Sequence, residues 1–352
     1  MQKSVRVINN IKFLKSVFTM RLLITDLNTE VNKGLEKKSA GSGVKIDIFK
    51  NANDVTDSAW NNADAIITYR GTKNVMKSIS LINKAKIIVR GGVGFDGLDL
   101  KELGKKGIAV CTVPDYGTTE VADHAMALML MMRRGLDQYD ELMRKNANQF
   151  WNYLQGPCID RIRGKTFGIY GLGRIGNAVA KRANSFDMNI VFYDPYLPDG
   201  SDLSSGYKRV DKPEELFKIS DTISIHCPLN EETHAVINKS FFSIAKKSLL
   251  LINTARGGII NLDDLYYAIK NNLISGAALD VLPTEPPDIS HPLINSYMKN
   301  ENWLRGKFTL TPHAAYYSPP GLEDLRSKAV KTIVEYLKYG NLRNCQNLKY
   351  LD

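Results

Sequence analysis

The feature that most constrains this chain is a strand, a glycine-rich turn, a helix and a second strand within residues 167–194. The stretch reads FGIYGLGRIGNAVAKRANSFDMNIVFYD. An apolar run leads into Gly171, Gly173 and Gly176 at GxGxxG spacing, and a helical pattern then leads to a second apolar run at residues 190–193. This order predicts a βαβ unit, which requires a parallel sheet with a helix on its face.

Each glycine of the turn has its own role in binding a dinucleotide. Gly171 permits the tight turn, Gly173 lets the backbone approach a pyrophosphate, and Gly176 lets the helix pack closely on the strand. The N–H groups at the helix start, at Arg174 and Ile175, then face the phosphates. Such glycines can also be purely structural. The flanking strands and helix are what favour a dinucleotide site.

Asp194 indicates which dinucleotide is bound. It follows the second apolar run directly. A carboxylate at this place accepts hydrogen bonds from a ribose 2′-OH and repels a 2′-phosphate. We therefore expect NAD rather than NADP.

Composition limits the class of protein. The 352 residues, 43% hydrophobic and 24% charged, suit two soluble globular domains. The longest strongly apolar run, residues 125–132, is too short to span a membrane and predicts a helix in the core or at a subunit interface. Neither a zinc site nor a disulfide framework is indicated, because no CxxC pair occurs among the four cysteines Cys111, Cys158, Cys227 and Cys345. A reducing compartment, the cytoplasm, is the default.

The net charge of +10 is spread along the whole chain. Because the basic residues are mixed with acids, they predict a surface that attracts an anionic substrate and cofactor rather than nucleic acid. Residues 1–19 are basic and contain no acid. This pattern fits an organellar transit peptide, an upstream start codon or a poorly ordered extension.

Short apolar runs separated by helix-compatible stretches predict two parallel α/β sheets. The first series lies at residues 22–24, 44–48, 65–68, 87–89 and 108–111, and the second at residues 167–170, 190–193, 222–225, 249–252, 277–281 and 308–310. Helices are expected at residues 119–134, 214–219, 241–247, 262–272 and 323–338. Asn261 is the expected N-cap of the fourth of these helices, and Gly340 ends the last. We expect this last helix to return to the first domain.

A glycine-rich turn follows the fourth run of the first series, where the chain reads RGGVGFD from Arg90. Ligands bind at the carboxyl ends of strands in open α/β sheets, so the N–H groups of this turn could hold a carboxylate. The turn could equally contain glycines only because it needs positive φ angles. The residues alone leave both interpretations open.

Three polar residues follow strands of the second series: Arg256, Glu285 and His313. Histidine is the usual proton donor near neutral pH, and a carboxylate beside it would orient it and favour its protonated form. A guanidinium would bind a substrate carboxylate and polarise the adjacent carbonyl. Taken singly, the three also fit a surface ion pair, a solvated loop acid and a hydrogen-bonded histidine at the sheet edge. The spacing of these residues alone does not decide between the catalytic interpretation and these structural ones.

Seven segments resemble the D-isomer-specific 2-hydroxyacid dehydrogenase family, in that family's order. They are RGGVGFDGLDL, GIYGLGRIG, FYDPY, HCPLN, NTARGG, ALDVLPTEPP and TPHAAYYS. The resemblance is closest to the branch of the C-terminal-binding-protein corepressors, through Arg90, DPY, the HAA-aromatic run and RNCQN. It implies two doubly wound parallel-sheet domains. Residues 1–118 and 319–352 would form a flavodoxin-like substrate domain, with 1–19 as an extension, and residues 119–318 a Rossmann NAD-binding domain.

The resemblance also implies roles for the three polar residues. His313 would protonate the carbonyl oxygen of a 2-oxo acid while the nicotinamide delivers hydride, and Glu285 would be its carboxylate partner. Arg256 would bind the substrate. The carboxylate of the substrate would also be held by Arg90, Gly92, Val93 and Gly94. Positions along the cofactor correspond to His226, Cys227, Pro228, Asn230, Thr254, Ala255 and Asp280, and no metal is implied.

Two departures from the family pattern concern the region of the expected active site. Tyr316 stands where the corepressor branch has tryptophan. The interval between Glu285 and His313 is longer than usual, with residues 300–306 as the insertion. This insertion could cover the mouth of the active site or only lengthen a surface loop.

Two functions follow from the resemblance. The first is an NAD-dependent oxidoreductase of small 2-oxo and D-2-hydroxy acids. The alternative is an NAD(H)-sensing corepressor or scaffold that binds peptide motifs, which would place the protein in the nucleus, and the two are not exclusive. A homodimer is expected, with no membrane or direct nucleic-acid partner.

Overall fold

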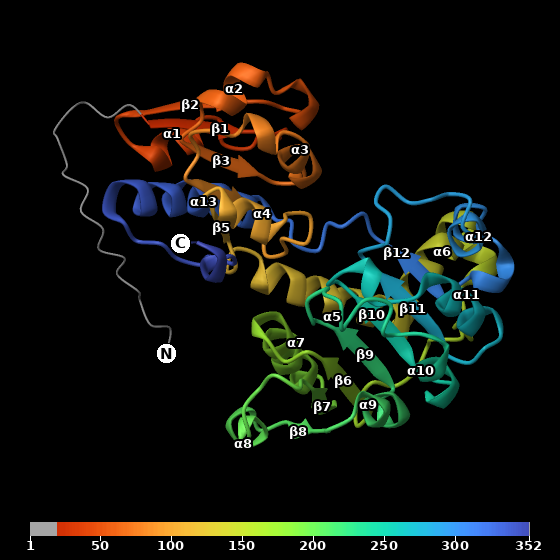
Figure 1. Ribbon diagram of the computed structural model, residues 1–352. Helices are drawn as coiled ribbons and strands as arrows, with labels where there is room; N and C mark the ends of the chain where they lie inside the picture. Colours follow the sequence, from red (N-terminus) through yellow and green to blue (C-terminus); the bar gives the residue numbers. More distant parts are fainter. Residues whose placement is uncertain (1–19, 352) are drawn as a thin grey trace. The chain divides into compact units, whose positions relative to one another are not determined.

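The computed structural model describes residues 20–351 of the chain (Figure 1). The chain forms two compact units. Unit 1 consists of the described parts of Met1–Gly117 and Ser318–Asp352, and unit 2 is Thr118–Tyr317. The two domain boundaries expected from the sequence, after residues 118 and 318, each lie one residue later than the observed ones. The interpretations of residues 1–19 fall outside the described residues.

The described part of unit 1 contains a five-stranded parallel sheet in the order β2-β1-β3-β4-β5. This is the strand order of a flavodoxin-like sheet, which confirms the predicted fold class. The strands are β1 (Met20–Ile24), β2 (Val44–Ile48), β3 (Ala65–Thr68), β4 (Ile87–Arg90) and β5 (Ala109–Thr112). The helices are α1 (Leu35–Ala40), α2 (Asp57–Asn62), α3 (Thr72–Lys77), α4 (Leu100–Lys105) and α13 (Pro319–Tyr339).

Helices cover both faces of this sheet, so its central strands read as continuous apolar runs. Ile67 and Val89 face a core that includes Ala329 and Val330 of α13. The neighbouring side chain Ile66 faces the opposite core, built with α2, α3 and α4. The alternation follows from the period of two along a strand.

The final helix, α13, returns to unit 1 as expected and ends at Gly340, whose φ is 70°. It begins earlier than predicted, because the Ser318 side chain accepts a hydrogen bond from the Gly321 N–H and Pro319 occupies the first turn, where proline is tolerated. Arg326 of α13 forms a buried ion pair with Glu36 of α1, with 2.6 Å from Nε to Oε1. These contacts bind the returning helix to the first half of the unit.

Unit 2 contains, in the described residues, a seven-stranded parallel sheet in the order β12-β11-β10-β9-β6-β7-β8. The order reverses between β6 and β9, which is the Rossmann arrangement, and ligands bind at that reversal. The strands are β6 (Thr166–Tyr170), β7 (Asn189–Tyr193), β8 (Lys208–Arg209), β9 (Thr222–Ile225), β10 (Leu250–Asn253), β11 (Gly276–Leu279) and β12 (Phe308–Leu310). The helices are α5 (Thr118–Arg134), α6 (Leu136–Phe150), α7 (Arg174–Ser185), α8 (Ser201–Ser205), α9 (Pro213–Ile219), α10 (Lys239–Ile244), α11 (Leu262–Lys270) and α12 (Pro292–Met298). Asn261 caps α11 as predicted, accepting a hydrogen bond from Asp264 N–H at 3.1 Å.

The apolar run of residues 125–132 lies in α5 and packs into the core of its own unit. Ala125 and Met129 are fully buried against α7 and the sheet. The core interpretation is therefore correct for these two residues. Ala127 is exposed and Leu130 and Met131 are only partly buried, so a subunit interface along this helix stays a prediction.

The insertion at residues 300–306 contains the short 3₁₀ turn η4 (Asn302–Leu304) and leads into the amino end of β12. Leu304 is buried, and the ring of Trp303 packs edge-on against Tyr266 of α11 at 5.9 Å. Because the strands are parallel, this edge of the sheet is opposite to the carboxyl ends where the predicted site residues lie. Within unit 2, the insertion lengthens a packed surface loop and does not cover those residues.

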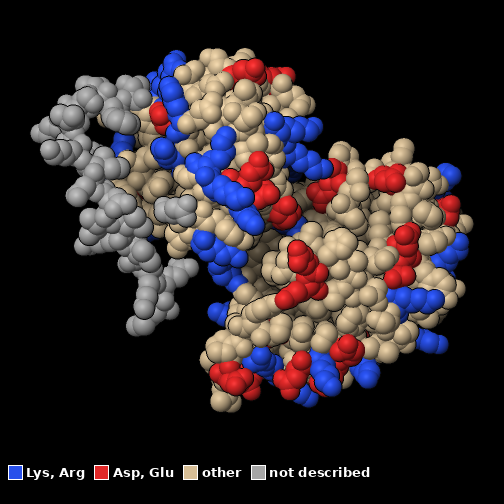
Figure 2. Space-filling view, viewed as in Figure 1, with Lys and Arg blue, Asp and Glu red and all other residues tan. Residues whose placement is uncertain are grey.

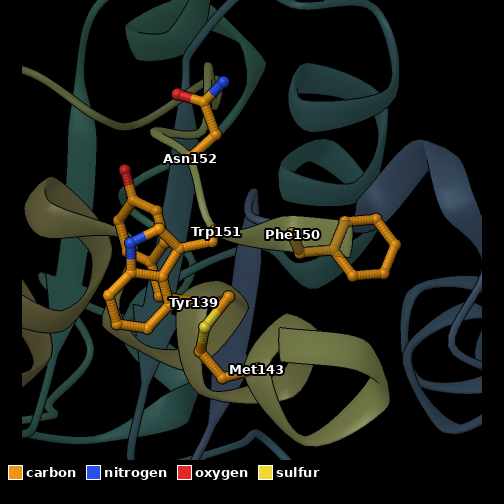
Figure 3. Close-up of a pocket in the computed structure, with 5 residues that line it drawn as sticks. All are labelled: Tyr139, Met143, Phe150, Trp151 and Asn152. Atoms are coloured by element: carbon orange, nitrogen blue, oxygen red, sulfur yellow. The ribbon is translucent and has the colours of Figure 1, made fainter. Parts of the chain in front are cut away.

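No helix in residues 20–351 combines the length and the apolar character needed to cross a membrane. Basic and acidic side chains are interspersed on the face shown in Figure 2. An open pocket of about 290 Å³ lies along α6, where Figure 3 shows its lining. The lining residues are Tyr139, Met143, Phe150, Trp151 and Asn152, and none of them is a predicted site residue.

Candidate active site

The structure brings His313 and Glu285 together at the carboxyl edge of the sheet in unit 2. His313 follows β12, and its Nδ1 lies 2.7 Å from Glu285 Oε2. The backbone N–H of Leu282, after β11, donates to the other carboxylate oxygen at 3.0 Å. Both side chains are about one-third exposed, 32% for His313 and 38% for Glu285. The pair is therefore fixed in geometry yet open to a ligand.

The surroundings of Glu285 keep it ionised. Burial by itself raises the pKa of this carboxyl group, but the hydrogen bond and charge of His313, the Leu282 N–H and the charge of Arg256 together lower the pKa below its ordinary value. An ionised carboxylate accepts the Nδ1–H of the imidazole. It thereby leaves Nε2 as the nitrogen that can exchange a proton with a ligand.

His313 is held in a backbone conformation that few residues other than glycine adopt, with φ of 51°. Its N–H donates to Asp280 O at 2.8 Å. The Asp280 carboxylate, almost fully buried, accepts hydrogen bonds from Ala314 N–H and Ala315 N–H, both at 2.9 Å, and from Thr311 Oγ1 at 2.5 Å. Asp280 therefore sets the turn that carries His313.

This use of Asp280 is one that sequence reasoning missed, because the resemblance placed Asp280 only along the cofactor. The signal is the parallel pairing of β11 with β12, which puts the ends of the two strands side by side. That pairing cannot be read from the order of residues. The cofactor contact of Asp280 stays a prediction.

Arg256 follows β10 in a turn fixed by Asn253. The Asn253 side chain accepts from Ala255 N–H and donates to Arg256 O, both at 2.9 Å. A Cβ on the next residue, Gly257, would lie 1.9 Å from the carbonyl carbon of Leu282. Only glycine fits at that distance, so the turn after β10 lies directly against the turn that holds Glu285. The effect of Arg256 on the pKa of Glu285 agrees with this placement.

The glycine loop after β6 has the geometry that its spacing predicts. Gly171 has φ of 96°, and a Cβ there would lie 2.8 Å from the Cys227 backbone N. A Cβ at Gly176 would lie 2.2 Å from Gly171 O, whereas one at Gly173 would meet no atom within 4 Å. Gly171 and Gly176 are thus required for the close approach of the backbone, and Gly173 leaves open space over the loop.

The start of α7 suits a phosphate group. The helix begins at Arg174 and continues with Ile175, and no side chain caps its first turn. Uncapped N–H groups at the start of a helix attract anions through hydrogen bonding and the helix dipole.

Asp194 lies directly against the glycine loop. Its Oδ2 accepts from Leu172 N–H and its Oδ1 from Tyr196 N–H, each at 3.0 Å. Each carboxylate oxygen has a further lone pair, so both can still accept a hydrogen bond from a ribose hydroxyl. The Asp194 carboxylate therefore lies beside the glycine loop, as the predicted contact with a ribose hydroxyl requires.

The loops after β9 and β10 carry the remaining predicted cofactor residues, which are His226, Cys227, Pro228, Asn230, Thr254 and Ala255. Thr254 Oγ1 and His226 Nδ1 are buried and have no hydrogen-bond partner among the described residues. Burial lowers the pKa of His226 to about 3, so this ring is neutral at physiological pH. Buried polar atoms normally have partners, and a dinucleotide over these loops could supply them.

The turn after β4 in unit 1 contains Gly92 with φ of 149°. Gly92 therefore supplies the positive φ angle that was one of the two interpretations of this turn. The Arg90 guanidinium donates to Gly91 O at 2.9 Å, and the Val93 side chain is 38% exposed. Binding of a carboxylate by Arg90, Gly92, Val93 and Gly94 stays a prediction.

Tyr316, the departure from the corepressor pattern, lies beside the catalytic candidate. Its ring is nearly perpendicular to that of His313, at 82°, with 6.4 Å between the ring centroids. A phenol at this place adds a hydrogen-bonding group that tryptophan would not present in the same position.

The chain is similar to known proteins in sequence and in fold. The sequence profile described as "D-isomer specific 2-hydroxyacid dehydrogenase, NAD binding domain" matches residues 126–315. The D-lactate dehydrogenase from Aquifex aeolicus, solved with NAD and lactic acid, superposes with a TM-score of 0.77 and 28% identity. The superposition covers 94% of this chain and 97% of that one.

Two curated relatives are longer proteins. D-3-phosphoglycerate dehydrogenase of Methanocaldococcus jannaschii is 39% identical over 226 residues, which are 64% of this chain and 42% of the relative. C-terminal-binding protein 1 of Caenorhabditis elegans is 33% identical over 287 residues, which are 80% of this chain and 38% of the relative. The chain thus matches less than half the length of either relative.

Proposed function

Because this chain belongs to the D-isomer-specific 2-hydroxyacid dehydrogenase family, we propose that it interconverts a small 2-oxo acid and its D-2-hydroxy acid with a nicotinamide cofactor. The observation that carries the proposal is the 2.7 Å contact between His313 Nδ1 and Glu285 Oε2. Arg256 lies close enough to influence the same carboxylate. A fold retained only for binding would not need these three side chains together.

The residues act on different atoms of the substrate. A bound reduced nicotinamide supplies the hydride for the carbonyl carbon. His313 donates the proton on Nε2 to the carbonyl oxygen, and in the reverse direction it removes the proton from the hydroxyl group. Glu285 holds the ring and balances its positive charge. Arg256 binds the carboxylate and stabilises the negative charge that develops on oxygen.

The cofactor site fits a dinucleotide through the glycine loop, the uncapped start of α7 and the buried Thr254 Oγ1, which has no hydrogen-bond partner within residues 20–351. We assign the pyrophosphate to the N–H groups of α7 and the adenosine ribose to Asp194. NAD rather than NADP is the proposed cofactor, because the Asp194 carboxylate would repel a 2′-phosphate.

The second candidate function is an NAD(H)-sensing corepressor or scaffold that binds peptide motifs. It is favoured by the 33% identity to C-terminal-binding protein 1 over 80% of the chain. Tyr316, however, stands where that branch has tryptophan, and its ring lies beside that of His313. The two functions are compatible in one protein, so the test must measure binding and turnover separately.

Purified protein mixed with NADH and a panel of 2-oxo acids tests the proposal. The enzyme is expected to consume NADH, measured by its absorbance, with at least one small 2-oxo acid. NADH affinity is measured independently by fluorescence titration. Tight NADH binding without turnover of any acid would contradict the enzymatic function and favour the second candidate.

Asp194→Ala is expected to reduce the preference for NADH over NADPH by about ten- to hundredfold, because a hydrogen bond to a charged group contributes about 1.5–3 kcal/mol. The measurement is the ratio of kcat/KM values for the two cofactors. Asp199→Ala is the control, since it removes a carboxylate from the same surface, fully exposed and only loosely paired with Arg209 at 3.8 Å. An unchanged ratio in Asp194→Ala would remove Asp194 from the ribose site.

Glu285→Gln is expected to lower kcat for 2-oxo acid reduction by about tenfold or more, because the amide cannot balance positive charge on the His313 ring. Burial raises the pKa of the Glu285 carboxyl group, but its hydrogen bonds and the neighbouring charges lower it below its ordinary value. The wild-type carboxylate is therefore expected to keep its charge, and the enzyme its rate, to a lower pH than an ordinary glutamate would allow. The measurement is the pH–rate profile of both proteins. An unchanged kcat in the variant would show that the carboxylate does not support the proton donor.

A further inference from the structure

Two cysteines that are far apart in the sequence lie opposite each other in unit 1. Cys111 belongs to β5, and Cys345 lies in the tail after α13. The two residues form an isolated antiparallel bridge, and both are free thiols. Neither belongs to the proposed catalytic or cofactor site, which leaves their proximity unexplained by the reaction.

The register of this bridge suits a covalent link. Gln346 N–H donates to Val110 O at 2.8 Å, and Thr112 N–H donates to Asn344 O at 3.2 Å. Cys111 and Cys345 therefore occupy the position without hydrogen bonds between these two pairs. At such positions the Cα atoms are about 4.5 Å apart, within the roughly 4.4–6.8 Å that a disulfide spans. The spacing typical of this bridge position is therefore compatible with a disulfide.

The two thiols differ in reactivity. Cys111 is fully buried, whereas Cys345 is partly exposed. A hydrogen bond between the two thiols, together with burial, raises the pKa of Cys111, and the same hydrogen bond lowers the pKa of Cys345 to about 7. Cys345 is thus the nucleophile that a reagent in solution can reach, and Cys111 is the thiol placed to react next.

The tail is held so that Cys345 stays in place. Asn347 is fully buried, and its Oδ1 accepts from Val110 N–H at 2.8 Å and from Cys345 Sγ at 3.3 Å. Its Nδ2 donates to Ile108 O at 2.9 Å. One asparagine therefore connects the tail, the β5 backbone and the reactive thiol.

The other two cysteines are unsuited to oxidation. Cys158 is buried, its thiol donates to Ser275 O at 3.2 Å, and burial raises its pKa. Burial raises the pKa of Cys227 to about 12. Both remain thiols at neutral pH, so a mild oxidant should discriminate between these cysteines and Cys345.

We propose that Cys111 and Cys345 form a reversible disulfide when the protein meets a peroxide, and that this modification fastens the C-terminal tail to β5. The Cys345 thiolate attacks one oxygen of hydrogen peroxide, the O–O bond breaks, and the released hydroxide takes up a proton to become water. The Cys111 sulfur then attacks the sulfenic acid formed at Cys345. The S–O bond breaks, the hydroxyl group leaves with the Cys111 proton as a second water, and the S–S bond forms.

Hydrogen peroxide is the oxidant in this reaction. Two thiols give up two electrons and two protons, and hydrogen peroxide is reduced to two molecules of water. A dithiol reductant returns the electrons and protons and restores both thiols.

Thiol counting in the full-length protein tests the proposal. After treatment with hydrogen peroxide and unfolding, the four free thiols are expected to fall to two, and dithiothreitol should restore four. The intact mass should drop by two hydrogens. A non-reducing digest should contain the peptide of Cys111 linked to the peptide of Cys345. The oxidation rate should rise with pH and level off above about 7.

Two variants separate the site from general oxidation. Cys345→Ser, at the partly exposed position, is expected to abolish the loss of two thiols, whereas Cys158→Ala should still lose two. If the buried Cys158→Ala protein does not fold, the wild-type peptide map still identifies the linked residues. Sulfinic acid at Cys345 with Cys111 still free, a link to another cysteine, or four thiols remaining after peroxide would each overturn the proposal.

Hydrogen exchange tests whether the link fastens the tail. The amides of Gln346 and Thr112, which bond across the bridge, are expected to exchange more slowly in the oxidised protein than in the reduced protein. Equal rates in the two forms, with the disulfide present by mass, would show that the bond does not hold the tail.

Discussion

His313→Gln is expected to lower kcat for 2-oxo acid reduction by about 10²- to 10⁴-fold, the contribution usual for a positioned general acid. Glutamine retains much of the volume and can still hydrogen-bond to Glu285, but it cannot exchange a proton near neutral pH. NADH affinity should stay nearly unchanged, because none of the proposed cofactor contacts is made by the His313 side chain. Steady-state kinetics and a fluorescence titration with NADH measure the two effects separately.

The matched control for this variant is His291→Asn. His291 caps α12, with its Nδ1 accepting from Leu293 N–H at 3.2 Å, and an asparagine oxygen can take over that hydrogen bond. This variant should keep the wild-type kcat. If His313→Gln also kept it, another group would have to supply the proton, and the assignment of His313 would be wrong.

Arg256→Gln is expected to lower kcat/KM by about 10²- to 10³-fold, the loss typical when one donor to a developing oxyanion is removed. The guanidinium has two tasks, since it binds the substrate carboxylate and stabilises charge on the carbonyl oxygen. Both KM and kcat should therefore change. The measurement is a full saturation curve with the best 2-oxo acid of the panel.

Arg256→Lys is the informative companion variant. It keeps the positive charge but lacks the planar pair of donors that matches a carboxylate. We expect it to recover part of kcat and to leave KM raised. Wild-type values for both constants in Arg256→Gln would exclude Arg256 from the substrate site, and full recovery in Arg256→Lys would exclude bidentate binding.

The sheets could be predicted from the sequence because buried parallel strands leave a strong local signal. The four residues of β3 are all buried, and their mainly apolar sequence was sufficient to place the strand. The glycine loop is predictable for a similar reason, since Gly176 approaches the carbonyl of nearby Gly171 and Gly171 itself has a positive φ of 96°. The cap at Asn261 is equally local. The close approach of Gly171 to Cys227 is long-range and could not be predicted.

Features that depend on which strands are neighbours could not be predicted. Asp280 orients the turn of His313 because β11 pairs with β12, and no spacing along the chain reveals this. The pairing of Cys111 with Cys345 likewise depends on how the tail lies on β5. The early start of α13 was missed because two consecutive prolines resemble a break, whereas Ser318 makes them the first turn of a helix.

The electrostatics of the site is also a product of the fold. The pKa of Glu285 is determined by competition between burial and three partners, namely His313, Leu282 and Arg256. Sequence reasoning identified two of these partners as catalytic candidates. It could not weigh burial against hydrogen bonding, because both depend on the distances in the folded chain.

The central claim is that His313 and Arg256 direct hydride and proton to a 2-oxo acid so that a D-2-hydroxy acid forms. The most direct test is complete reduction of the best 2-oxo acid with NADH carrying deuterium at the transferable position, followed by chiral analysis and mass spectrometry of the product. We predict the D-2-hydroxy acid with one deuterium on the carbon that bears the hydroxyl group. An L or racemic product, or a product without deuterium at that carbon, would contradict the account.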